Sequence, residues 1–99
     1  MMKCYPNVTF SDHALRQIES REELELSDIA MALRNPERVY PARKGRLMCD
    51  HAVSDRLCLR VVFVERESAL GIMAHVVTAY HMNRDRAERQ ANHANPESA

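Results

Sequence analysis

No apolar run in this 99-residue sequence approaches the roughly 20 residues that a membrane-spanning helix needs. The first ten residues, MMKCYPNVTF, contain no apolar segment of the kind found in secretory signal peptides. The three cysteines are odd in number and have no Cys-x-x-Cys spacing, which argues against a disulfide framework and suits a reducing compartment. Together these absences predict a cytoplasmic protein.

The sequence also lacks a glycine-rich phosphate loop and an internal repeat. Apolar residues make up 45% of the chain and charged residues 28%, which is ordinary for a globular domain. A chain of this length can build one modest core. We therefore expect a single domain over residues 1–81, followed by a polar tail over residues 82–99 that is partly helical or disordered.

The stretch 57–80 carries the strongest structural pattern. Two apolar, β-branched runs, LCLRVVFV and IMAHVVTAY, flank a short charged connection. This pattern predicts a β-hairpin with strands at about 57–64 and 69–80. The first run is apolar on both faces, as in a central strand that is covered on both sides. Arg60 lies within that strand, and its permanent charge needs either a wet cleft or a partner, for which Asp50 is a candidate.

Two short helices are expected before these strands. Ser11 is a good N-cap for a helix over about 12–21, and Ser27 is a good N-cap for a second helix over about 28–34. An Asn-Pro pair then ends the second helix, because the residue before a proline resists the helical region.

Three further segments are expected to be extended, at about 8–10, 37–40 and 46–53. Pro41 places the middle segment at a sheet edge, because proline cannot donate a ladder hydrogen bond. Helices followed by hairpin-connected strands indicate an α+β fold. We expect a short N-terminal strand and two helices on one face of a three- to four-stranded antiparallel sheet.

The charges are segregated, although the formal net charge is zero. Arg43, Lys44 and Arg46 form a basic turn that could bind nucleic-acid phosphates whatever the base sequence. Arginine suits such a role because its guanidinium contacts phosphate in a bidentate manner. The same residues could equally form a solvated strand edge, since charged side chains guard exposed edges.

Four short motifs stand out: TFSDHALRQ near the start, NPERV after the second helix, and the strands RLCLRVVFV and HVVTAY. Together they resemble a family of small bacterial domains of unknown function that is grouped with the RelE/ParE-like toxins and related nuclease folds. The resemblance covers about residues 8–80 and implies a RelE/ParE-like α+β fold. In the wider superfamily, toxins of this shape cleave mRNA on the ribosome or poison DNA gyrase, and an antitoxin encoded beside them keeps them silent. A catalytic set does not follow from the resemblance, because fold does not fix function.

RNA can be cut without a metal ion or cofactor if a base takes the 2′-hydroxyl proton, an acid protonates the leaving oxygen and a cation stabilises the phosphate. Histidine suits the acid and base roles, and arginine suits the role of the cation. The central candidates at the family-like motifs are His13, Arg60 and Tyr80, and the supporting candidates are Arg16 and Thr78. Our first hypothesis is a metal-independent endoribonuclease of the toxin family that acts on RNA, free or on the ribosome.

Each candidate also has an ordinary structural interpretation. His13 could be a surface histidine near a helix start, Arg60 could be neutralised by a carboxylate, and Tyr80 could lie at the edge of the core. Our second hypothesis is a non-catalytic module that binds nucleic acid without cutting it, or binds a protein such as an antitoxin, gyrase or a second copy of itself. This hypothesis predicts an exposed apolar patch or an open strand edge.

Metal-binding residue types also occur on the predicted strands, at Cys49, His51, Cys58, His75 and His81. Their spacing matches no zinc pattern, and a free cysteine commonly acts as a small buried hydrophobic residue. We therefore predict no metal site.

Overall fold

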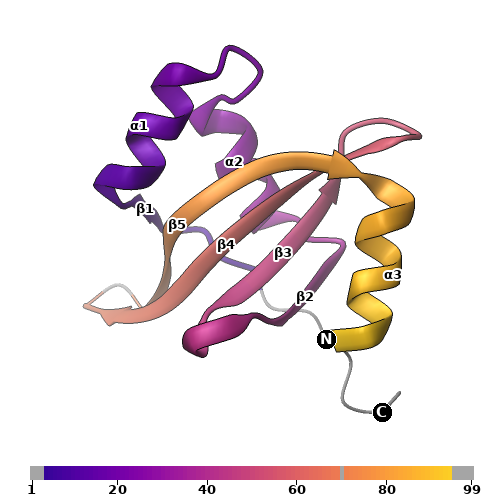
Figure 1. Cartoon of the computed structure of the whole chain (residues 1–99). Coiled ribbons are helices and arrows are strands. Elements are labelled where there is room, and N and C mark those ends of the chain that lie inside the picture. Colours follow the sequence, from indigo (N-terminus) through magenta and orange to yellow (C-terminus); the bar gives the residue numbers. More distant parts are fainter. Residues whose placement is uncertain (1–3, 70, 95–99) are drawn as a thin grey trace.

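The computed structural model describes residues 4–69 and 71–94 of the chain. It shows an α+β fold with a five-stranded sheet, and Figure 1 places α1 and α2 on the opposite side of the molecule from α3. The elements in chain order are β1 (Val8–Phe10), α1 (Asp12–Ser20), α2 (Leu26–Arg34), β2 (Arg38–Pro41), the 3-10 turn η1 (Arg43–Gly45), β3 (Leu47–Ala52), β4 (Leu57–Ser68), β5 (Gly71–Asn83) and α3 (Arg84–Ala94).

The sheet has the strand order β1-β5-β4-β3-β2. β4 is the middle strand, as its two apolar faces predict, and β2 with Pro41 lies at an edge. The expected three- to four-stranded antiparallel sheet is wrong in two respects, because β1 joins as a fifth strand and runs parallel to β5. Thr9 of β1 faces His75 of β5, 66 positions later, so no local sequence pattern could reveal this pairing.

The hairpin of β4 and β5 is longer than predicted. The two strands pair from Leu57 opposite Asn83 to Ser68 opposite Gly71, so the charged segment expected to be a connection continues the ladder. Gly71 has a φ of +107°, which a residue with a side chain rarely adopts. The register shifts between Val62 and Phe63, which marks a β-bulge.

The first hydrogen bonds of α1 and α2 fix where each helix starts. Ser11 caps α1 as predicted, with its Oγ accepting the Ala14 N–H at 3.1 Å. The predicted N-cap at Ser27 is wrong, because α2 starts earlier and the Glu25 carbonyl already accepts the N–H groups of Asp28 and Ile29.

The main core lies between the sheet and the two N-terminal helices. Its buried helix residues include Ala14, Ile29 and Leu33, which pack in one cluster with Val61 and Phe63 of β4. Burial of such aliphatic and aromatic side chains is the main force that holds these layers together.

The opposite face of the sheet is partly covered by α3. This helix follows β5 without a loop, and Asn83 caps it by accepting the N–H groups of Asp85 and Arg86. Ala87 is fully buried, so part of the expected polar tail packs back onto the sheet. Residues 95–99 of that tail lie outside the described residues. None of the described helices is long and apolar enough to cross a bilayer.

Candidate functional site

A buried ion pair lies in the middle of the sheet face that α3 covers. The strand register sets Arg60 of β4 opposite Asp50 of β3, and their side chains are only 2% and 1% exposed. Arg60 Nε donates to Asp50 Oδ1 at 2.9 Å, and Arg60 Nη2 donates to Asp50 Oδ2 at 3.1 Å. The structure thus confirms Asp50 as the predicted partner of the buried charge.

Tyr40 of the edge strand β2 completes this network. Its hydroxyl donates to Asp50 Oδ2 at 2.9 Å and accepts a hydrogen bond from Arg60 Nη2. Burial, together with the charge of Asp50, raises the pKa of Tyr40 above its ordinary value, so the phenol remains a donor. The Arg60 guanidinium carbon also lies 5.5 Å from the centre of the Tyr40 ring, within the range of a cation–π contact.

Arg60 remains positively charged in this environment. Burial alone would lower its pKa, but the hydrogen bonds and charge of Asp50 more than offset that effect and raise it. The third nitrogen, Nη1, donates to Gln90 Oε1 of α3. Hydrogen bonding to Tyr80 of β5 also contributes to the raised pKa.

A cavity of about 460 Å³ opens beside this network, and we call it the basic pocket. The turn between β2 and β3 supplies two arginines, β3, β4 and β5 supply the floor, and α3 borders the cavity. Its lining residues are Ala42, Arg43, Arg46, Met48, Arg60, Val62, Thr78, Tyr80 and Gln90. Among these described lining residues there is no histidine and no carboxylic acid, so the pocket favours an anion.

The backbone of the basic turn holds the two arginines in place. Ala42 N–H donates to the Arg46 carbonyl at 2.8 Å, and Arg46 N–H donates to the Arg43 carbonyl at 3.2 Å. Lys44 and Gly45 at the tip have positive φ angles of 60° and 73°. These two backbone hydrogen bonds close the turn, although Lys44 itself does not line the basic pocket.

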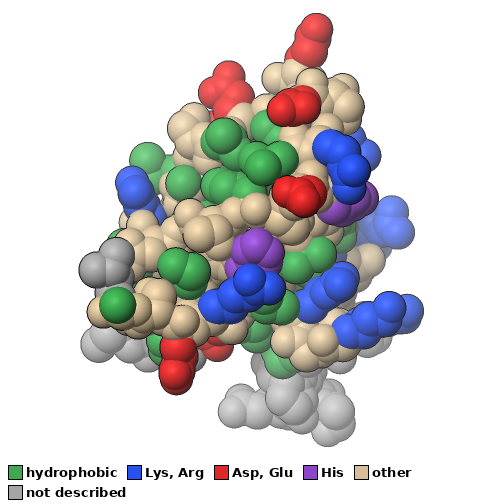
Figure 2. Space-filling model, turned by 90° about the vertical axis from the view of Figure 1, so that its left-hand side faces the viewer, with side chains coloured by type: hydrophobic (Ala, Val, Ile, Leu, Met, Phe, Trp, Pro, Cys, Tyr) green, Lys and Arg blue, Asp and Glu red, His purple; other side chains and the backbone are tan. Residues whose placement is uncertain are grey.

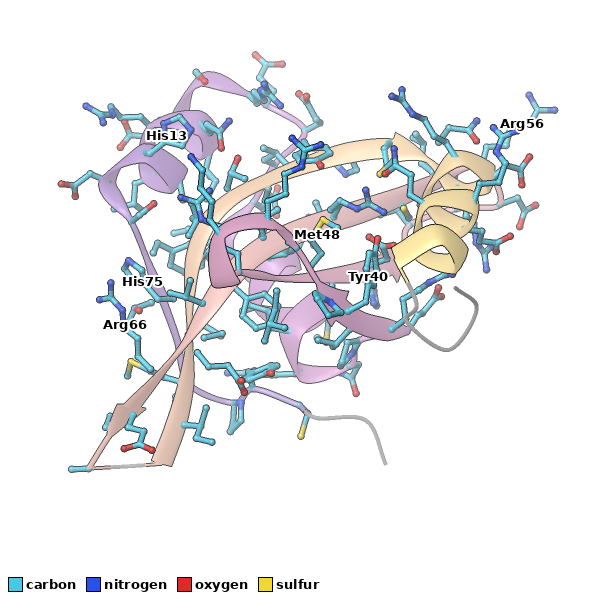
Figure 3. All side chains as sticks on the ribbon, turned by 60° about the horizontal axis from the view of Figure 1, so that its bottom comes forward. His13, Tyr40, Met48, Arg56, Arg66 and His75 are labelled. Atoms are coloured by element: carbon cyan, nitrogen blue, oxygen red, sulfur yellow. The ribbon has the colours of Figure 1, made fainter. Side chains whose placement is uncertain are left out.

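The basic pocket gathers five of the eight residues that the sequence suggested: Arg43, Arg46, Arg60, Thr78 and Tyr80. The other three, His13, Arg16 and Lys44, are exposed and do not line it. Figure 3 shows His13 on α1 far from Tyr40, so the structure does not unite the proposed histidine with the Arg60 network.

Two residues of the site were missed. Gln17 of α1 accepts a hydrogen bond from the hydroxyl of Thr78, which lines the basic pocket. Gln17 thus connects α1 to the site. Gln17 follows His13 by four positions on the polar stripe of α1, which could have signalled it. Gln90 lies in the expected tail, where nothing in the local sequence indicated a return to the sheet.

None of the described cysteines and histidines lines the basic pocket. Cys49 points into the main core, where its Sγ lies 3.4 Å from the Ala32 carbonyl, while Cys58 belongs to the opposite face of the sheet. Burial raises the pKa of Cys49 to about 12. His75 Nδ1 lies 2.8 Å from Thr9 Oγ1. Among the side chains that the structure describes, residues 4–69 and 71–90, no group of three or more histidine, cysteine or acidic residues could hold a metal ion.

A second surface feature lies between β1 and α2. It is an open groove of about 520 Å³, lined mainly by apolar residues that include Val8, Phe10, Leu26, Ala30 and Met73. Leu26 is 45% exposed, and β1 lies at the edge of the sheet. Figure 2 shows apolar side chains gathered on one face of the molecule, with charged side chains around them.

No protein-family model, curated protein or solved structure matches this chain. The candidate site is therefore interpreted from its own chemistry.

Proposed function

We propose that this chain binds RNA through the basic pocket, as a RelE/ParE-like protein. The main support for this proposal is that Arg43 and Arg46 line a cavity whose described lining contains no acidic side chain. Neither arginine forms an ion pair with any described residue, whereas Arg60 is already paired with Asp50. Two unneutralised guanidinium groups that line one cavity favour a ligand with several negative charges, such as a phosphate backbone.

The rest of the pocket suits a nucleotide better than a bare anion. Met48 and Val62 provide an apolar floor, and Tyr80 provides an aromatic ring beside the arginines. Proteins that bind single-stranded nucleic acid combine positive charge with aromatic side chains in this way. A volume of about 460 Å³ is also within the size range of small-molecule sites.

The geometry supports binding of RNA better than its cleavage. The pocket offers Arg60 as a cation and Tyr80 as a phenol, but the histidine proposed as acid or base lies elsewhere. A metal-independent ribonuclease would have to use Tyr80 for proton transfer, with Arg60 stabilising the phosphate. The toxin activity that the resemblance implies is a hypothesis for the cleavage assay below.

The test is binding of a fluorescent RNA single strand of about 12 nucleotides in EDTA, measured by anisotropy at several salt concentrations. The double variant Arg43→Ala/Arg46→Ala is expected to weaken binding about tenfold or more and to reduce the salt slope by about 1.4. Arg21→Ala/Arg34→Ala is the matched control, because it removes the same charge from two exposed arginines outside the basic pocket. Equal losses in both double variants would refute a defined site.

The same samples, run on a denaturing gel, test cleavage. Loss of a cleavage activity in both Arg60→Ala and Tyr80→Phe would support the ribonuclease hypothesis. If the RNA stays intact in a sample that binds it, the protein binds RNA without cleaving it under these conditions.

The second candidate function is a protein-binding module. It is favoured by the open edge of β1 and the apolar groove beside it, since extended peptides can add to an exposed sheet edge. An antitoxin or a second copy of the chain would fit this role. Measurement of the molar mass by light scattering tests the second copy directly, and a monomer at all concentrations would exclude it.

A further inference from the structure

Arg60 has only one nitrogen left for a ligand. A guanidinium carries five N–H donors. Asp50 and Tyr40 take the bonds from Nε and Nη2, which are directed into the buried network. Nη1 is the remaining nitrogen: one of its two N–H groups donates to Gln90 of α3, and Tyr80 is a further hydrogen-bonding partner of the guanidinium.

A phosphate oxygen that approaches Nη1 would therefore compete with the Gln90 amide oxygen. We propose that α3 is a latch on the basic pocket, in which Gln90 occupies Arg60 until an RNA phosphate displaces it. This inference rests on the proposed RNA binding. The exchange is favourable at Arg60 itself, because a charged phosphate oxygen is a stronger acceptor for a guanidinium than a neutral amide oxygen.

Few contacts hold α3 in place. Ala87 is the one buried side chain among those described on this helix. Glu88 pairs with Arg38 at 3.7 Å, but both side chains are partly exposed, and such pairs add little stability. Arg84 Nε is buried and has no hydrogen-bond partner among the described residues, which is unfavourable for the docked position.

The connection to the sheet also permits release. β5 passes directly into α3 at Asn83, and the Arg84 N–H donates to the Arg56 carbonyl at 2.8 Å, which ties the start of the helix to the turn between β3 and β4. The rest of the helix can swing away from the sheet about this junction. An isolated helix of 11 residues is only marginally stable in water, so a released α3 would also lose helical structure. Release of α3 would then uncover Arg60 beside Arg43 and Arg46.

The latch makes two predictions of opposite sign for the same side chain. Gln90→Ala removes the competing acceptor, so the full chain should bind the RNA single strand about three- to tenfold more tightly. Gln90→Glu should bind it more weakly, because a carboxylate would pair with Arg60 and hold the latch closed. Arg89→Gln is the matched control for charge, since it lowers the net charge equally at an exposed neighbouring position, and it should weaken binding less than Gln90→Glu.

Hydrogen exchange gives an independent readout. RNA should accelerate amide exchange in α3 of the unmodified protein while it slows exchange in the turn that carries Arg43 and Arg46. Slower exchange in α3, or weaker binding by Gln90→Ala, would show that Gln90 contacts the ligand and would overturn the latch. Equal affinities of the parent and Gln90→Ala would also overturn it and leave RNA binding intact, whereas no binding by either protein would refute both proposals.

Discussion

Removal of the Asp50 carboxylate is expected to destabilise the fold more than any surface change. Asp50→Ala would delete two hydrogen bonds from Arg60 and one from Tyr40, and would leave a guanidinium that is only 2% exposed. Breaking a buried ion pair by removing one partner costs about 3–5 kcal/mol, a large part of the roughly 5–15 kcal/mol that stabilises a typical domain. At about 4–8 °C per kcal/mol, Tm should fall by at least about 12 °C.

The assay is urea unfolding followed by circular dichroism, with Asp55→Ala as the control. Asp55 is exposed in the turn between β3 and β4, so its removal should change the free energy of unfolding by less than about 0.5 kcal/mol. The double variant Asp50→Leu/Arg60→Met should recover most of the loss, because it removes both buried charges together. If Asp50→Ala lowers the free energy of unfolding by less than about 1 kcal/mol, with an unchanged urea slope, the native fold does not need Asp50 to balance the buried charge of Arg60, and the reasoning is refuted.

Three further predictions concern the buried groups. Tyr40→Phe removes a buried hydroxyl bonded to a carboxylate and should cost about 1–3 kcal/mol in the same urea assay. Because folding raises the pKa of the Cys49 thiol from 9.0 to about 12, its contribution to stability should be constant below pH 9 and decline as the pH rises toward 12. The pH dependence of the unfolding free energy, compared with that of Cys49→Ala, measures this decline. A thiol reagent at neutral pH should label exposed Cys4 in the folded protein, and Cys49 and Cys58 only after unfolding.

The sequence predicts features that depend on neighbours along the chain or across a hairpin. The apolar run of β4 indicates a central strand, and a charge within it requires a partner, which is why Asp50 could be found in advance. The helix cap at Ser11 follows equally local rules.

Features that depend on distant packing were not accessible in this way. The pairing of β1 with β5 joins segments that are far apart in sequence. The docking of α3 depends largely on Ala87 and Gln90, which look like ordinary residues of a polar helix. Periodicity places His13 and Gln17 on one polar stripe of α1, but it does not say which of them approaches the sheet.

The parallel pairing of β1 with β5 has a consequence for how the chain folds. The β4–β5 hairpin closes through near neighbours in sequence, whereas β1 must find a strand whose matching residue lies 66 positions later. Contacts between such distant segments are slow to form, because closing a long loop costs conformational entropy before any contact is gained. During synthesis from the N-terminus, β1 therefore cannot pair until β5 has been made, and this edge of the sheet is completed late.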